Sequence, residues 1–194
     1  MNGLIYVARH GETPLNAAGL LRGRLDPPLT AKGQMQAEAL AGALQEQGIR
    51  LIVSSPLQRA VATAHAVAER VGLQVEIDER FNDRDYGAWA GTSRDEVEVC
   101  WGSVDDAPGV EPADAVLERV LEGFSETAAK LGDGVGLIVS HDAINRPLLV
   151  ALEVSLAGRV IPQETGCYNV LRSTDDAWRV ESVNNVPPYP KGDA

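Results

Sequence analysis

The chain has 194 residues, of which 44% are hydrophobic, so it is long enough for one well-filled α/β core and short for two independent domains. Its formal net charge of -11 at pH 7 argues against binding to nucleic acid or to an anionic membrane, because both attractions need a basic surface. We therefore expect a single domain over residues 1–194, and any phosphate that it binds must meet a local basic pocket.

The cysteine usage and the apolar segments bear on the compartment. Cys100 and Cys167 stand in no CxxC or metal-ligand spacing, so a disulfide framework is not indicated and a reducing compartment is the simpler assumption. The first apolar run is interrupted at Arg9, and no apolar segment approaches the roughly 20 residues of a membrane span. We expect a cytoplasmic protein without a membrane partner.

Strand-like and helix-like patterns alternate along most of the chain. In chain order, we expect a strand at 4–8, a helix at 30–47, a strand at 51–54, a helix at 56–71, a strand at 73–77, a helix at 112–131, a strand at 136–140, a helix at 142–153, and a closing antiparallel hairpin at 168–171 and 178–181. Thr30 suits the first helix as its cap, and Gly72 suits the end of the second. This rhythm predicts an α/β protein, a three-layer α/β/α sandwich around a mostly parallel central sheet with an antiparallel edge.

Two segments depart from that rhythm. Glycine and proline interrupt the pattern over residues 81–111, where we expect loops with a short helix that together form a lid insertion. The charged and aromatic residues of this insertion favour a hydroxylated or partly cationic organic group over a polyanion; they are Arg94, Glu98, Trp101, Asp105 and Asp106. The proline-rich segment 186–194 is expected to be a flexible tail.

Two of the expected strands each deliver a histidine to one edge of the sheet. Arg9 and His10 follow the first strand, and His141 follows the strand at 136–140. Arg59 lies in the first turn of the helix that follows the strand at 51–54. The carboxyl ends of parallel strands form the functional crevice of an open α/β sheet. Because arginine matches phosphate oxygens with paired N–H donors, these side chains are suited to converge on one dianion.

Several spaced motifs reinforce this interpretation. They are Arg9-His10-Gly11-Glu12-Thr13 with Asn16, Leu25-Asp26-Pro27-Pro28-Leu29-Thr30 with Gly33 and Gln36-Ala37, Ser54-Ser55-Pro56-Leu57-Gln58-Arg59-Ala60 with Thr63-Ala64, Tyr86-Gly87-Ala88-Trp89-Ala90-Gly91, and Val139-Ser140-His141. In this order, and over most of the chain, they resemble the histidine phosphatase superfamily, also called the phosphoglycerate mutase-like family.

The resemblance implies roles for individual residues. His10 would be the nucleophile that becomes phosphorylated, while Arg9, Arg59 and His141 would hold the phosphoryl group. Asn16 would add a donor to the phosphate, unless it is a loop residue that hydrogen-bonds its own backbone. Arg22 stands where relatives often carry a shorter polar residue, and it either reaches the pocket or points to water.

The leaving alkoxide needs a proton, and a carboxylic acid whose pKa is raised by burial can supply it and then act as base on the hydrolytic water. The family usually places a glutamate shortly before the Gly-x-Trp segment, and the aligned residue here is Asp83, which is one methylene shorter. Asp85 is a nearby rival. Asp142, where many relatives have glycine, is a third carboxylate that either contacts substrate or caps the following helix.

Three functions follow from this resemblance. The first is hydrolysis of a small phosphorylated metabolite by a phosphatase, the second is a cofactor-dependent phosphoglycerate mutase, and the third is a catalytically weak phosphate-binding protein. The length of this chain favours the first function. The resemblance implies that the family's mutases are longer chains, whose extra segments enclose the substrate and exclude water. We expect no metal or other cofactor, since arginines crowding His10 would repel a cation. No sequence feature decides the oligomeric state, and a homodimer stays open.

Overall fold

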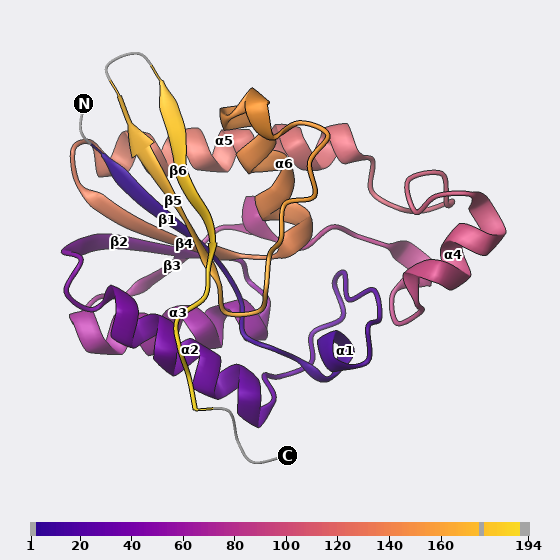
Figure 1. The fold of residues 1–194 in the computed structure, drawn as a ribbon, viewed down its shortest axis with the longest axis horizontal. Coiled ribbons are helices and arrows are strands. Elements are labelled where there is room, and N and C mark those ends of the chain that lie inside the picture. The colour runs from indigo at the N-terminus through magenta and orange to yellow at the C-terminus, as the bar shows by residue number, and fades with distance from the viewer. Residues whose placement is uncertain (1–2, 175–176, 191–194) are drawn as a thin grey trace.

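The computed structural model describes residues 3–174 and 177–190 of the chain. Its elements in chain order are β1 (Leu4–Arg9), α1 (Pro14–Ala17), α2 (Ala31–Leu44), β2 (Ile49–Ser54), α3 (Gln58–Val71), β3 (Val75–Ile77), α4 (Arg94–Trp101), α5 (Ala113–Leu131), β4 (Val135–Ser140), α6 (Asp142–Leu152), β5 (Tyr168–Ser173) and β6 (Trp178–Asn185). Figure 1 shows α2 and α3 on one face of a central sheet, with α5 and α6 on the other.

The sheet has six strands in the order β3-β2-β4-β1-β5-β6. Strands β3, β2, β4 and β1 run parallel to their neighbours, whereas β5 and β6 pair antiparallel along one edge. The predicted three-layer α/β/α sandwich with an antiparallel edge is therefore confirmed.

Strand β1 shows why the central strands of the sheet have continuous apolar sequences. Successive side chains of a strand point to opposite faces, so Ile5 and Val7 enter one apolar cluster while Tyr6 and Ala8 enter another. The first cluster is completed by α5 and α6, including Phe124. The second is completed by α2 and α3. Both faces of the central strands are thus buried by helices.

Local capping sets several helix ends. The Thr30 hydroxyl accepts the Gly33 N–H at 3.0 Å at the start of α2, as the sequence predicts. Gly72 ends α3 in the left-handed conformation, with φ of 71°. The short helix α1 was not expected from the sequence. Thr13 and Asn16 form a capping box around its first turn, with Pro14 at the first helical position.

The strand register brings the two histidines together. Strands β1 and β4 are neighbours, and Arg9 lies opposite Ser140. His10 and His141 each follow one of these paired residues, so they leave the sheet side by side. Strand β2 lies on the other side of β4 and delivers Ser55 and α3 to the same edge. Three parallel strands therefore end at one crevice, as expected for a sheet of this kind.

The segment 81–111 contains loops and α4, as predicted. Figure 1 shows α4 standing outside the three layers, next to the end of the sheet where α1 lies. A third apolar cluster holds this segment, including Leu21, Tyr86 and Val97. Leu21 also exchanges backbone hydrogen bonds with Gly91 and Thr92, each 2.8 Å long. The segment is thus tied to the loop that carries Arg22, and its action as a lid stays a prediction.

The C-terminal segment contains no helix or strand over residues 186–190. Gln36 donates to the Tyr189 hydroxyl at 3.3 Å, so this part of the predicted tail contacts α2. Residues 191–194 of the predicted tail lie outside the described residues. Within the described ranges, no helix has the length and apolar character needed to cross a membrane.

Candidate active site

His10 lies directly after β1 and is fully buried. Its Nδ1 is 2.6 Å from the Gly11 carbonyl oxygen. Because a carbonyl only accepts, Nδ1 carries the hydrogen and Nε2 keeps its lone pair. Burial, reinforced by the charges of Arg59 and Arg9, holds the pKa of His10 well below its usual value. His10 is therefore a neutral imidazole whose Nε2 carries the lone pair.

Arg59 faces that nitrogen from the first turn of α3. Its Nε lies 3.3 Å from His10 Nε2, and its side chain is fully buried. The two terminal nitrogens donate to the carbonyls of Leu25 at 2.6 Å and Gly23 at 2.8 Å, and one of them also contacts Asp83 Oδ2 at 2.9 Å. These contacts fix the guanidinium plane beside the nucleophile.

Arg9 brings a second guanidinium to the crevice. Its Nη1 donates to the Gln163 carbonyl, and its Nη2 lies 3.8 Å from Asp142 Oδ1. Its Nε is buried and has no hydrogen-bond partner among the described residues. Burial lowers the pKa of Arg9, although Asp142 opposes this effect. Arg9 thus holds a buried positive charge with an unmet donor, which an oxyanion would satisfy.

His141 stands across from His10, with ring centroids 5.0 Å apart. Its Nε2 is 2.8 Å from the Ser55 hydroxyl. Its Nδ1 is buried without a hydrogen bond in the described part of the chain and lies 3.6 Å from Asp83 Oδ2. Burial and the charge of Arg59 hold the pKa of His141 well below its usual value. The lowered pKa favours the neutral ring, and its Nδ1 has no hydrogen-bond partner within the described residues.

Asp83 is the fully buried carboxyl group of the site. Its Oδ2 contacts Arg59, and its Oδ1 accepts the Arg84 backbone N–H at 2.9 Å. Burial raises the pKa of Asp83, while Arg59 and Arg22 act in the opposite direction. The net shift is toward a higher pKa, which is the direction that suits a general acid.

The two rival carboxylates differ from Asp83. Asp85 has a side chain that is 39% exposed and contacts Arg24 at 3.5 Å and the Gly87 N–H at 2.8 Å. Asp142 is nearly enclosed, and burial works against its ionisation. Arg9, Arg22 and Arg146 nevertheless hold the pKa of Asp142 below its usual range. Asp142 is therefore a fixed anion rather than a proton carrier.

Arg22 reaches the pocket, while Asn16 is engaged locally. Arg22 Nη2 lies 2.5 Å from Asp142 Oδ1, and only 13% of its side chain is exposed. Asn16 Oδ1 accepts from the Thr13 backbone N–H at 3.0 Å and from the Thr13 hydroxyl at 2.8 Å. These contacts match the alternative in which Asn16 bonds the local backbone, and its role toward phosphate stays a prediction.

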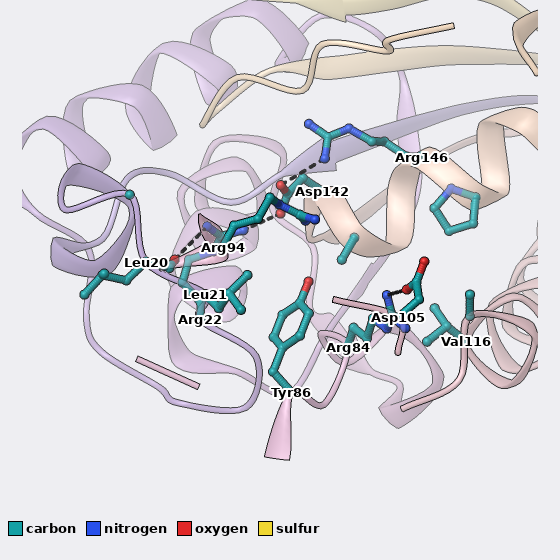
Figure 2. A pocket seen from close by; sticks show the side chains of 14 residues that line it. Leu20, Leu21, Arg22, Arg84, Tyr86, Arg94, Asp105, Val116, Asp142 and Arg146 are labelled. Atoms are coloured by element: carbon teal, nitrogen blue, oxygen red, sulfur yellow. Dashed lines mark hydrogen bonds and ion pairs between the residues drawn. The ribbon is translucent and has the colours of Figure 1, made fainter. Parts of the chain in front are cut away.

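A pocket of about 470 Å³ opens beside these groups. It is lined by Gly19, Leu20, Leu21, Arg22, Arg84, Tyr86, Arg94, Asp105, Ala113, Val116, Asp142, Ala143, Arg146 and Pro147. Figure 2 shows Asp142 linked to Arg22 and to Arg146, the Arg84–Asp105 pair separate from them, and the Tyr86 hydroxyl directed toward Asp142. Of the site residues described above, Arg22 and Asp142 line this pocket.

The lining differs from the one suggested by the lid sequence. Glu98, Trp101 and Asp106 are absent from it, and Trp101 packs edge-to-face on Trp89 instead, with ring centroids 6.1 Å apart. Four arginines and two aspartates line the pocket. Two of the lid residues, Arg94 and Asp105, do line the pocket, and the expected preference for a hydroxylated or partly cationic group stays a prediction.

Sequence reasoning missed several residues that shape the site. Ser55 orients His141, and the Gln163 carbonyl orients Arg9. Arg84 and Arg146 line the pocket. The available signals were the place of Arg84 directly after Asp83 and the helical i,i+4 spacing of Arg146 from Asp142. No group of three His, Cys, Asp or Glu side chains within 3–174 and 177–190 is arranged to hold a metal ion.

Comparisons with known proteins agree with this geometry. The chain is 38% identical over 158 residues to phosphoserine phosphatase 1 of Hydrogenobacter thermophilus, covering 76% of this chain and 75% of that protein. It is 28% identical over 184 residues to an uncharacterised phosphatase named PhoE of Bacillus subtilis, covering 93% of each. The solved structure of a mycobacterial glucosyl-3-phosphoglycerate phosphatase in complex with VO3 superposes with a TM-score of 0.82 at 27% identity, covering 94% of this chain and 99% of the other.

Some relatives are longer than this chain. It spans 40% of the length of the curated Mycobacterium proteins that it matches at 36% identity over 147 residues. The family model that matches covers residues 5–186, which is nearly the whole chain, and is described as the histidine phosphatase superfamily, branch 1. The protein therefore belongs to branch 1 of the histidine phosphatase superfamily.

Proposed function

We propose that this protein hydrolyses small phosphomonoesters through a phosphohistidine formed on His10. The observation that carries the proposal is the state of that side chain. His10 is neutral, its Nδ1–H is held by the Gly11 carbonyl, and its Nε2 lone pair lies beside the buried Arg59 guanidinium. A nucleophile prepared in this way, with fixed positive charge at the attacked group, suits phosphoryl transfer without a metal.

In the first step, His10 Nε2 attacks phosphorus in line with the ester oxygen. The N–P bond forms and the P–O bond to the organic group breaks. Arg9, Arg59 and the free Nδ1 of His141 stabilise the charge on the remaining oxygens. Asp83, whose pKa is raised by burial, gives its proton to the leaving alkoxide.

In the second step, water attacks the phosphohistidine. The Asp83 carboxylate, now without its proton, accepts one from that water. The N–P bond breaks, inorganic phosphate leaves, and the neutral His10 is restored. Atoms and charges balance over the two steps, and the net reaction is hydrolysis of one ester bond. The relatives named above are called phosphatases, which supports hydrolysis rather than isomerisation.

Replacing His10 with alanine tests this proposal directly. Turnover of p-nitrophenyl phosphate, measured by phosphate release with a chelator present, should fall at least about a thousandfold because the covalent route is lost. The matched control is His65→Ala, which removes an exposed histidine from α3 and should retain wild-type turnover. Turnover that survives in His10→Ala, or that the chelator abolishes in the wild type, would contradict the mechanism.

A further inference from the structure

We infer that Arg119 and Glu111 position the general acid Asp83, because together they hold the backbone of the segment 80–85 that contains it. The inference rests on the proposed hydrolase mechanism, in which Asp83 protonates the leaving alkoxide. Neither Arg119 nor Glu111 lines the pocket in Figure 2. They act on the reaction through Asp83 and are therefore positioning residues.

The segment 80–85 needs partners for its backbone. Its residues from Asn82 onward belong to no helix or strand, and a buried carbonyl outside such elements needs a donor from elsewhere. Arg119 reaches the segment from α5. Its Nη1 donates to the carbonyls of Arg80 at 2.6 Å and Asn82 at 2.8 Å, and its Nη2 donates to the carbonyl of Asp83 at 3.3 Å. One guanidinium thus fixes three carbonyls of the segment, including that of the acid itself.

Glu111 completes the arrangement just before α5. Its Oε1 accepts from Arg119 Nε at 2.8 Å, and its Oε2 accepts from Nη2 at 3.1 Å. The same Oε2 accepts the Asp85 backbone N–H at 3.0 Å, while the Glu111 N–H donates to the Asp85 carbonyl at 2.8 Å. Arg119 therefore makes five hydrogen bonds, which matches the five N–H groups of a guanidinium. The Arg119–Glu111 pair holds the backbone both before and after Asp83.

This pair is largely shielded from water. The side chains of Arg119 and Glu111 are 19% and 15% exposed. Burial opposes the ionisation of Glu111, but Arg119 and the Asp85 N–H outweigh it and hold the pKa of Glu111 below its ordinary value. The pair is therefore charged, and its two parallel N–H···O bonds fix its geometry. Lysine carries its three donors on one nitrogen and cannot span the same set of acceptors.

Phe81 attaches the segment to the core by contacts that do not involve Arg119. Its carbonyl accepts the Ser140 hydroxyl at 2.8 Å, and its side chain is fully buried. A Cβ at Gly123 of α5 would lie 3.2 Å from the Phe81 ring, so the helix packs closely on it. Replacement of Arg119 should therefore leave the segment attached at Phe81, while the Asp83 carbonyl loses the donor that Arg119 provides.

The position of this backbone matters because the acid is an aspartate. One methylene separates the Asp83 carboxyl group from its Cα, so the side chain compensates poorly for a displaced backbone. Its Oδ1 accepts the Arg84 N–H at 2.9 Å, and that N–H would move with the same segment. A general acid must come within about 3 Å of the leaving oxygen, and a misplacement of about 1 Å can cost about a hundredfold in rate.

Arg119→Gln tests the inference through the leaving group. Steady-state kcat/KM is measured for glycerol 2-phosphate, whose alkoxide needs a proton, and for p-nitrophenyl phosphate, whose nitrophenolate does not. We expect a loss of at least about tenfold on the first ester and of less than about threefold on the second. Arg70→Gln is the matched control, since it makes the same substitution at the ion pair with Glu38 between α3 and α2, and it should leave both values unchanged. Equal losses on the two esters in Arg119→Gln would overturn the inference.

The Asp83→Asn background separates positioning from general stability. If Arg119 acts through Asp83, adding Arg119→Gln to Asp83→Asn should lower kcat/KM for glycerol 2-phosphate by less than about twofold. A loss as large as in the wild-type background would show that the two residues act independently, and the inference would fail.

Asp83→Asn by itself shows which proposal fails. If it affects both esters equally, the acid assigned in the proposed function is wrong, and the inference about Arg119 is wrong with it. If Asp83→Asn discriminates between the esters and Arg119→Gln does not, the inference alone is wrong and the hydrolase mechanism stands.

Arg119→Lys decides the outcome if circular dichroism shows that Arg119→Gln does not fold. Lysine keeps the positive charge opposite Glu111 but loses part of the contacts with the three carbonyls. The ratio of kcat/KM for glycerol 2-phosphate to that for p-nitrophenyl phosphate should fall at least about threefold in this variant. A wild-type ratio in folded Arg119→Lys would contradict the positioning role.

Discussion

Asp83 stands where the resemblance to the family places a glutamate, and it is one methylene shorter. Its carboxyl group still reaches Arg59 at 2.9 Å and lies 3.6 Å from His141 Nδ1, so the missing methylene does not remove it from the histidines. Complete burial raises the pKa of Asp83, and this effect exceeds the lowering by the nearby arginines. Asp83 therefore lies close to the histidines, and its pKa is shifted in the direction that suits a general acid.

Asp83→Asn should separate substrates by leaving group. Hydrolysis of an alkyl phosphate should fall about 10²–10⁴-fold, because the alkoxide then leaves without a proton. Hydrolysis of p-nitrophenyl phosphate should fall less than about tenfold, because nitrophenolate leaves without help. Steady-state kcat/KM for both esters in the wild type and in Asp83→Asn checks this. Equal losses on both esters would contradict proton donation by Asp83.

The pH profile of the same reaction follows from the directions of two pKa shifts. The raised pKa of Asp83 means that the acid is lost only as the pH rises through that higher value, so kcat/KM for the alkyl phosphate should decline on the alkaline side. The lowered pKa of His10 keeps the nucleophile neutral below its ordinary value of 6.5, so activity should persist on the acid side there. In Asp83→Asn the alkaline decline should disappear. An acid limb centred near 6.5 would contradict the shift at His10.

At the scale of elements, the start of α2 positions the loop that follows β1. Thr30 donates its N–H to the Glu12 carbonyl at 2.9 Å, and Glu12 donates its N–H to Gln36 Oε1 at 2.8 Å. A side chain at Gly33 would place its Cβ 2.1 Å from the Glu12 carbonyl oxygen, and one at Gly11 would meet the Gly33 carbonyl oxygen at 2.3 Å. These two glycines allow the helix and the catalytic loop to pack backbone against backbone.

Gly33→Ala and Gly42→Ala should therefore shift stability in opposite directions, although both lie in α2. Gly42 has open space at its Cβ, and alanine there should stabilise the protein by up to about 1 kcal/mol through helix propensity. Gly33→Ala should cost about 1–3 kcal/mol because the Glu12 backbone must move. It should also lower turnover, since His10 lies on the displaced loop. Denaturant unfolding and p-nitrophenyl phosphate assays check this, and a stabilised Gly33→Ala would contradict the close packing.

At the scale of the whole molecule, an acidic protein contains a basic interior site. Arg9 and Arg59 are both buried at the carboxyl ends of the sheet, and burial lowers the pKa of each. Lowered pKa values for buried cations mean that the surrounding protein groups compensate their charge incompletely. A bound dianion would supply that compensation, so ligand binding and global stability should be linked.

Orthovanadate should therefore raise the melting temperature of the protein. At about 100 times its dissociation constant, a ligand that binds only the folded state contributes roughly 2.7 kcal/mol, which corresponds to about 5–10 °C for a chain of this length. Differential scanning calorimetry at constant ionic strength, with chloride as the reference anion, measures the shift. Arg9→Gln should reduce it. An equal shift with chloride would mean general screening of the net charge rather than occupation of the site.

Several elements of the fold are indicated by short stretches of the sequence alone. The strand before His10, the Thr30 cap and the Gly72 stop depend on neighbouring residues, and the structure has all three. Helix α1 was missed because its four residues carry no hydrophobic period, although Thr13, Pro14 and Asn16 form a capping signal. The lid composition did not indicate which of its residues line the pocket, and Glu98 and Asp106 do not.

The sequence by itself determined the family, the α/β/α layering and the convergence of His10 and His141. Strand patterns are local, and parallel strands end at one edge. Only the tertiary structure decided the charge of the pocket beside Asp142 and the burial of the site residues. Arg22 and Asp142 are 120 positions apart, and their 2.5 Å contact exists only after folding. The pKa shifts at His10 and Asp83 likewise arise from burial, which depends on every element packed around them.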